Sequence, residues 1–312
     1  MVDCIIDGGS LWARSYFAAV KCGKDPVALA TRTTLNMMRG DHAFGRRVDR
    51  AMVCWDGMAK TKKKRVSEKP GDYAPLQESY SKQIQEMIGL VSVKLDDYEA
   101  DDVVASASEQ STAGSVIVVS GDKDLTQLQC ERVAFYDLHQ KMVLSRRAIC
   151  SRFFVHHPIQ ISLALAIQGD TGDGIHGVVG WGPGRVKKLF SEIDSETPFD
   201  KVVDYLLSKM NENQQKQFLE CLEVTLLRTD IEGVPEAAQI ALNTSLVAEF
   251  ESTSQFSAMQ MNSCSAVQSF NSRKEAEDEA IRLELSANVF PCSACLRWHM
   301  EPRSSESAED LG

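Results

Sequence analysis

Three short apolar runs in this sequence are each followed by an aspartate that has a glycine next to it. The runs and their acids are Val2–Ile6 with Asp7, Ala51–Trp55 with Asp56, and 116–119 with Asp122. Runs of this length, separated by helix-length segments, are typical of buried parallel strands. The segments with helical character between and after them are 27–39, 76–89 and 101–110. The pattern therefore predicts an α/β fold with a parallel sheet.

The acids that follow these runs are expected to meet in space. In an open parallel sheet the carboxyl ends of the strands lie at one edge, where ligands bind. Asp7, Asp56, Asp122 and the neighbouring Asp124 should then converge although they are far apart in the chain. Any one of them alone is better explained as a turn residue, because aspartate and glycine favour turns. Three strand ends of the same kind favour a shared site.

Two further acidic clusters extend this set. The first, "DYEADDVV", places Glu99, Asp101 and Asp102 at the start of a predicted helix. Acids there favour the helix dipole, but the run holds more acids than a cap requires. Residues two apart in a helix point to nearly opposite faces, so we expect Glu99 at or just before the helix start. The second cluster, "QGDTGDGIHG", places Asp170 and Asp173 in a glycine-rich turn after an apolar helix.

A converging set of acids requires cations. The candidate carboxylates are Asp7, Asp56, Glu99, Asp101, Asp102, Asp122, Asp124, Asp170 and Asp173. Two like charges 4 Å apart repel by about 4 kcal/mol at an effective dielectric of about 20. Oxygen ligands without His or Cys select Mg²⁺ or Mn²⁺. Two such ions sharing carboxylates form the kind of site that cleaves phosphodiesters.

Charge and composition set the expected surroundings. The net charge is −10, yet the segment Lys60–Lys69 is strongly basic. Its cations include Lys62, Lys63, Lys64, Arg65 and Lys69. A local basic block is a possible phosphate-binding surface, and the alternative is a solvated charged loop. Nine cysteines without a basic leader or a membrane-length apolar run indicate a reducing, cytoplasmic setting.

The order of the motifs "DGGSLWARSYFA", "CWDG", "YEADD", "SGDKDLTQL" and "GDTGDGIHGVVGWGPGRVKKL" resembles the flap endonuclease and 5′-nuclease superfamily. The likeness is to bacteriophage flap endonucleases and to the 5′-nuclease domain of bacterial DNA polymerase I. It covers about residues 1 to 235. The resemblance implies a PIN-like core, a requirement for divalent metal, and removal of 5′ flaps or digestion of DNA from its 5′ end.

The resemblance also implies roles for individual residues. The first metal site would draw on Asp7, Asp56, Glu99, Asp101 and Asp122. The second would draw on Asp101, Asp122, Asp124, Asp170 and Asp173, with Asp102 close to both. Arg14 would contact the scissile region and Tyr16 would stack on a base, against the alternative that Tyr16 packs on the sheet.

The basic segment would belong to a helical arch, about residues 57–95, that admits a single-stranded 5′ end. Arg65 and Pro70 match an Arg-x₄-Pro pattern of phage and polymerase members. Those members continue with Tyr-Lys, but no Lys follows Tyr73 here, which puts the arch's catalytic basic residue in doubt. One of the neighbouring lysines, at 62, 63, 64 or 69, could replace it.

The segment "GVVGWGPGRVKKLF", residues 177–190, resembles the family's helix-turn-helix element, the helix-three-turn-helix. Its candidate DNA contacts are Gly180, Gly182, Gly184, Arg185, Lys187 and Lys188. Glycine turns and helix N-termini offer backbone amides to phosphates, and in the family a K⁺ ion often helps to bridge this hairpin to duplex DNA. Phosphate contacts carry no base code, so we expect recognition of structure rather than sequence.

The predicted organisation is a nuclease core at 1–160, a helix-turn-helix subdomain at 161–240 and a partly disordered extension at 241–312. Cys292 and Cys295, with His299 nearby, are the elements of half a zinc site. The expected partner is DNA with a 5′ flap or 5′ end, with RNA–DNA hybrids left open, beside replication proteins such as a polymerase or single-strand-binding protein. We expect a monomer without a membrane partner, in a bacterial or phage-infected cell. The alternatives are a PIN-type ribonuclease, which usually lacks the hairpin, and a catalytically silent DNA-binding scaffold.

Overall fold

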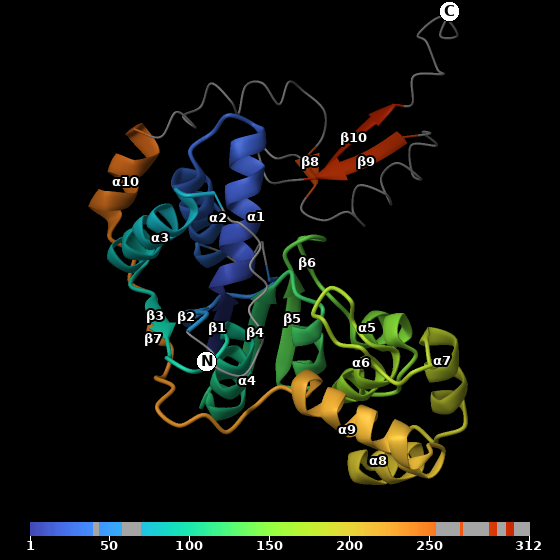
Figure 1. Ribbon diagram of the computed structural model, residues 1–312. Helices are drawn as coiled ribbons and strands as arrows, with labels where there is room; N and C mark the ends of the chain where they lie inside the picture. The colour runs from blue at the N-terminus through green and yellow to red at the C-terminus, as the bar shows by residue number, and fades with distance from the viewer. Residues whose placement is uncertain (40–43, 58–69, 254–268, 271–286, 292–297, 303–312) are drawn as a thin grey trace, which may run out of the picture. The chain divides into compact units, whose positions relative to one another are not determined.

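The structure is a computed structural model that describes residues 1–39, 44–57, 70–253, 269–270, 287–291 and 298–302 (Figure 1). The strands are β1 (Val2–Asp7), β2 (Arg50–Trp55), β3 (Val91–Lys94), β4 (Ser115–Ser120), β5 (Val133–Asp137), β6 (Met142–Val143), β7 (Ala238–Gln239), β8 (Ser269–Phe270), β9 (Ala287–Pro291) and β10 (Trp298–Pro302). The α-helices are α1 (Gly8–Lys21), α2 (Pro26–Met38), α3 (Tyr73–Ile88), α4 (Ala100–Gln110), α5 (Arg146–Phe153), α6 (Ile161–Gln168), α7 (Pro183–Ser191), α8 (Phe199–Ser208), α9 (Glu212–Thr225) and α10 (Thr244–Thr253). Two 3₁₀ helices are η1 (Asp124–Leu128) and η2 (Pro158–Gln160).

The main sheet has the strand order β3-β2-β1-β4-β5-β6, with β7 paired to β2. The pairs β1–β2, β1–β4, β2–β3 and β4–β5 are parallel, whereas β5–β6 and β2–β7 are antiparallel. The chain leaves β1 towards β2 and later returns to pair β4 on the other side of β1. Strand order therefore reverses at β1, and in open α/β sheets ligands bind at such a switch point. The predicted parallel α/β architecture is confirmed.

The three predicted central strands form because both faces of the sheet are covered. In β1, β2 and β4 the last five residues of each strand are buried. Helices α1 and α2 begin where the sequence supplies N-caps: the Asp7 side chain accepts the Ser10 N–H, and the Asp25 side chain accepts the N–H groups of Val27 and Ala28, which follow Pro26. Pro at the first helical position lacks only an amide that would have no intrahelical partner. The predicted helices at 27–39, 76–89 and 101–110 are confirmed with shifts of at most three residues at either end.

Helices lie on both sides of the sheet. Helix α1 contacts α2, β1, β2 and β4, and α2 contacts α3, so these three helices cover one face. Helix α4 contacts β1, β2 and β4 from the other face. Helix α6 is buried over almost its whole length and contacts α5, α7 and α9. Figure 1 shows α5 to α9 grouped beyond β5, so this helical group adjoins the end of β4 through η1 and α6.

Residues 1–242 form one compact unit and residues 243–312 a second. The first unit contains both predicted segments 1–160 and 161–240, whose mutual boundary remains a prediction. The second contains α10 and a three-stranded antiparallel sheet, β8-β10-β9. The predicted half zinc site falls on Cys292 and Cys295, which lie outside the described residues. Within the described ranges, no helix combines the length and apolar character needed to cross a bilayer.

The predicted arch range, 57–95, includes two elements that pack in the core, and the extent of the arch remains a prediction. It contains α3, which contacts α2, and β3, which pairs in parallel with β2. Both elements are therefore built into the core, because their buried side chains complete the layer over β2. The basic residues Lys62, Lys63, Lys64, Arg65 and Lys69 lie outside the described residues.

Candidate metal centre

Asp7, Asp56 and Asp122 lie together at the carboxyl ends of β1, β2 and β4. Asp7 is buried and its two oxygens accept the Ser10 N–H at 3.0 Å and the Ser120 hydroxyl at 2.6 Å. A Cβ placed on Gly9 would lie 3.5 Å from Asp7 Oδ1 and 3.8 Å from Asp56 Oδ2, so both carboxylates face the same small space. The strand ends converge as the sequence predicts.

Asp56 connects this group to the start of α4. Its Oδ1 accepts the Ala100 N–H at 3.0 Å, so the end of β2 is tied to the first turn of the helix. Glu99 occupies the N-cap position of α4 and Asp101 is in its first turn, so both flank the amide that Asp56 binds. Asp102 Oδ1 accepts the Arg228 N–H at 3.1 Å, which links the same turn to the segment after α9.

Gly57 permits this arrangement because a side chain does not fit there. A Cβ at Gly57 would lie 1.9 Å from the Leu95 carbonyl oxygen, and the Gly57 N–H donates to the Tyr98 carbonyl. Gly57→Ala must therefore displace backbone and is expected to destabilise the protein by at least about 2 kcal/mol. Thermal unfolding measures this loss. Gly71→Ala is the matched control, because no described residue lies within 4 Å of a Cβ there; equal melting temperatures for the two variants would contradict the geometry.

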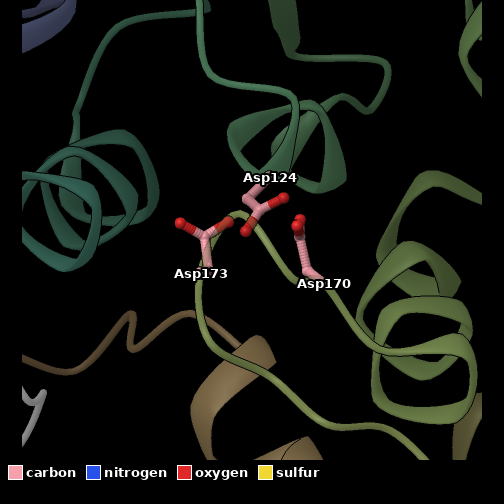
Figure 2. A group of neighbouring side chains, drawn as sticks. All are labelled: Asp124, Asp170 and Asp173. Atoms are coloured by element: carbon pink, nitrogen blue, oxygen red, sulfur yellow. The ribbon is translucent and has the colours of Figure 1, made fainter. Parts of the chain in front are cut away.

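A second acidic group consists of Asp124, Asp170 and Asp173. One carboxylate oxygen of each lies within 4.8 Å of those of the other two (Figure 2). Asp124 begins η1, while Asp170 and Asp173 come from the turn after α6, where Asp170 Oδ1 accepts the Gly172 N–H. The buried Asp124 Oδ1 has no hydrogen-bond partner among the described residues. Three neighbouring carboxylates, one of which has a buried oxygen without a partner in the described part of the chain, fit a hard cation, so this donor set suits Mg²⁺ or Mn²⁺.

The two acidic groups are electrostatically coupled through Asp122. Burial raises the pKa of Asp7 to about 6. The charges of Asp122 and Asp56 add to this increase, and two hydrogen bonds to Asp7 partly offset it. Burial, with the charges of Asp122 and Asp173, raises the pKa of Asp124 to about 7. Asp122 accepts the Asp124 N–H and lines one pocket with Asp173, so it connects the two groups in space as well. Six carboxylates therefore form one continuous acidic edge: Asp7, Asp56, Asp122, Asp124, Asp170 and Asp173.

The raised pKa values predict an unusual pH dependence of stability in metal-free protein. An aspartate with a folded pKa near 7 and an unfolded pKa near 3.9 holds more protons in the folded state, so stability falls as pH rises between these values. Asp124→Asn removes this titration. In the presence of a chelator, the stability of wild type relative to Asp124→Asn should decrease between about pH 4 and pH 7. Parallel melting temperatures of the two proteins across this range would contradict the prediction.

Lys123 is a functional candidate that the sequence reasoning left without a role. Its Nζ forms an ion pair with Asp170 Oδ2, 47 positions away. Burial alone would raise the pKa of Asp170. The Lys123 ammonium and a backbone amide outweigh burial and hold the pKa of this carboxyl below its usual value. The sequence did contain a signal for a role of Lys123 at the site, because this residue lies between Asp122 and Asp124 in "SGDKDL".

Arg14 lies beside this edge and has an unexpected partner. Its Nη1 is 3.0 Å from His139 Nδ1, and a Cβ on Gly121 would lie 2.6 Å from His139 Nε2. A guanidinium only donates, so His139 Nδ1 accepts. Burial lowers the pKa of Arg14, opposed by the charge of Asp137. No sequence spacing relates His139 to Arg14, since they are 125 positions apart.

Tyr16 does not fit its predicted role. The side chain is 2% exposed, and its hydroxyl donates to Asp72 at 2.6 Å. Its ring packs against Trp12, Phe17 and Tyr73. The expectation that Tyr16 stacks on a base is therefore corrected to the packing alternative, because the aromatic cluster over α1 encloses the ring.

The predicted hairpin residues lie between α6 and α8. Gly177 and Gly180 have φ of 68° and 80°, which favour glycine, and Gly182 is the N-cap of α7 with Pro183 next. The Arg185 guanidinium lies 4.6 Å from the centre of the Trp181 ring. Gly184, Lys187 and Lys188 are exposed on α7. This geometry leaves their DNA contacts as a prediction.

Comparison with known proteins gives three results. Residues 3–154 match the family described as 5′-3′ exonuclease, N-terminal resolvase-like domain. A 5′-3′ exonuclease of Aquifex aeolicus is 31% identical over 194 residues, 57% of this chain and 65% of that protein, and one of Streptomyces coelicolor is 26% identical over 247 residues, 69% and 80%. The match thus spans somewhat less than two thirds of the Aquifex protein. A bacteriophage T5 flap endonuclease, in a pseudo-enzyme–product complex with DNA and metal ions, shares the fold at a TM-score of 0.58 and 17% identity, over 73% of this chain and 90% of that one.

Proposed function

Because residues 3–154 match the family described as 5′-3′ exonuclease, N-terminal resolvase-like domain, we propose that the protein is a structure-specific 5′ nuclease that hydrolyses phosphodiester bonds in DNA. The observation that carries the proposal is the continuous acidic edge at the switch point of the sheet. Its six carboxylates come from four separate parts of the chain, and the buried Asp124 Oδ1 has no hydrogen-bond partner among the described residues. Such an arrangement is costly unless cations bind there.

Two groups of ligands are available for two Mg²⁺ or Mn²⁺ ions. Asp7, Asp56 and Asp122, flanked by Glu99 and Asp101, would hold one ion. Asp124, Asp170 and Asp173 would hold the other ion. Asp102 would support the first turn of α4 because it accepts the Arg228 N–H. When bound, such ions lower the pKa of the attacking water and offset charge on the phosphate and the leaving oxygen.

The chain's own cations would orient the phosphate. Arg14, held by His139 at the end of the sheet, presents a guanidinium that can donate to a phosphate oxygen beside Asp122. Lys123 neutralises Asp170 and limits repulsion between the acids and a phosphodiester. These two residues supply positive charge inside the acidic edge.

Substrate selection would depend on structure. The hairpin at 177–190 would bind duplex phosphates through the start of α7 and Lys187 and Lys188, with K⁺ as a bridging ion. The basic segment Lys60–Lys69 would receive the single-stranded 5′ end. RNA–DNA hybrids as substrates, and a polymerase or single-strand-binding protein as partners, fit this replication role as further proposals.

Cleavage of defined substrates tests the proposal. A labelled 5′-flap DNA should be cut near the junction in Mg²⁺, while a single-stranded RNA of the same length is cut much more slowly. Preferential cutting of the RNA would assign the protein to the ribonuclease alternative. Tight binding of the flap without cleavage in Mg²⁺ or Mn²⁺ would assign it to the scaffold alternative.

A further inference from the structure

Helices α5 and α7 form a basic region in an acidic protein. Three arginines lie on α5 and two lysines and one arginine on α7, and neither helix contains an acid. These residues are Arg146, Arg147, Arg152, Arg185, Lys187 and Lys188. The chain as a whole has a net charge of −10. Glu192 at the end of α7 interacts with Arg185 and Lys188, but the cations of the two helices outnumber the acids beside them, which indicates a binding surface for an anionic ligand.

The two helices line a shallow, open pocket that has both basic and apolar side chains. Arg146, Arg147 and Lys187 line it together with Phe154, Val155 and Phe190. Val155 and Phe190 are buried, but Phe154 is 40% exposed. Phe154 ends α5 with φ of 61°, a left-handed conformation that is uncommon for an aromatic residue. The Lys187 ammonium lies 5.5 Å from the centre of its ring.

An exposed aromatic ring among cations fits a nucleotide whose base is unpaired. The face of a base can stack on the ring while its phosphates are neutralised by Arg147 and Lys187, whereas the bases of a duplex are already stacked. A flat basic surface would suffice for duplex phosphates. The exposed ring of Phe154 therefore favours a single strand.

The pocket is also connected with the acidic edge through α5. On the other side of this helix, Arg152 lines a second pocket together with Asp122, Lys123, His139 and Asp173. A strand that leaves the acidic edge beside Arg152 can cross α5 and reach Phe154. We propose that the α5–α7 pocket, lined by Arg146, Arg147, Phe154 and Lys187, binds a single-stranded segment of the DNA substrate by base stacking on Phe154. The inference rests on the proposed nuclease function and names a second contact for its substrate.

Binding of defined oligonucleotides tests the site separately from cleavage. Fluorescence anisotropy with labelled oligothymidylate and with a blunt duplex, in Ca²⁺ to prevent turnover, gives both affinities for the full chain. Phe154→Ala should weaken oligothymidylate binding about tenfold and Phe154→Ala/Arg147→Ala further, while duplex affinity changes less than about twofold. Phe154→Trp should retain single-strand affinity because it keeps an aromatic face at this position.

Leu219→Ala and Lys201→Ala are matched controls, since Leu219 is exposed on α9 and Lys201 is exposed on α8. They should leave both affinities unchanged. Unchanged single-strand affinity in Phe154→Ala, or an equal loss for duplex, would overturn the proposal. The proposal would also be overturned if the protein did not bind oligothymidylate but bound an acidic, phenylalanine-containing peptide. That result would assign the pocket to a protein tail. These outcomes are independent of whether a flap is cleaved, which tests the proposed function.

Discussion

Asp122→Asn is expected to reduce cleavage of a 5′-flap DNA at least about a thousandfold while flap binding changes only a few fold. Asp122 lies between the two acidic groups, and its charge raises the pKa of both Asp7 and Asp124. The amide keeps the shape, and its oxygen can still accept the Asp124 N–H that Asp122 Oδ1 accepts at 2.9 Å. Loss of activity would therefore come from lost charge and metal binding rather than from misfolding.

Asp194→Asn is the matched control for this variant. Asp194 is exposed in the turn between α7 and α8, where its Oδ1 accepts the Glu196 N–H at 2.8 Å, a bond that asparagine can also accept. The control should cleave at the wild-type rate. Single-turnover cleavage of a saturating flap substrate separates chemistry from binding, and a wild-type rate in Asp122→Asn would exclude Asp122 from the reaction.

Metal removal is expected to have an equally large effect. EDTA should abolish cleavage, and Mg²⁺ or Mn²⁺ should restore it, because the acidic edge provides only oxygen ligands. Ca²⁺, which accepts longer and more flexible coordination, should restore thermal stability and substrate binding but little cleavage. Full activity in EDTA would contradict the account. The added metal should also raise the melting temperature most at neutral pH, where Asp7 and Asp124 lose protons.

The strands that position the site could be predicted because their signals are local. Each of β1, β2 and β4 is a buried apolar run followed by an acid, so the sequence alone indicates both the strand and the edge to which its acid belongs. Strand β3 was missed for the opposite reason. Only Val93 of its four residues is buried, as expected for a short strand near the edge of a sheet.

The partners of the charged groups could not be predicted because they depend on the packed fold. Lys123 meets Asp170 only when η1 packs against α6, and Arg14 meets His139 only when the turn after β5 reaches α1. Tyr16 shows the same limit. The family resemblance implied that Tyr16, two positions after Arg14, stacks on a base, but the packing of Trp12 and Tyr73 decides that its ring is enclosed.

Titration with Mn²⁺ followed by electron paramagnetic resonance tests the central assumption most directly, since it counts bound ions without requiring substrate. We predict two ions per wild-type chain, a marked loss of binding in Asp122→Asn, and no loss in Asp194→Asn. A wild-type protein that binds no Mn²⁺, or an Asp122→Asn variant that binds it as wild type does, would contradict the assignment of the acidic edge as a metal centre.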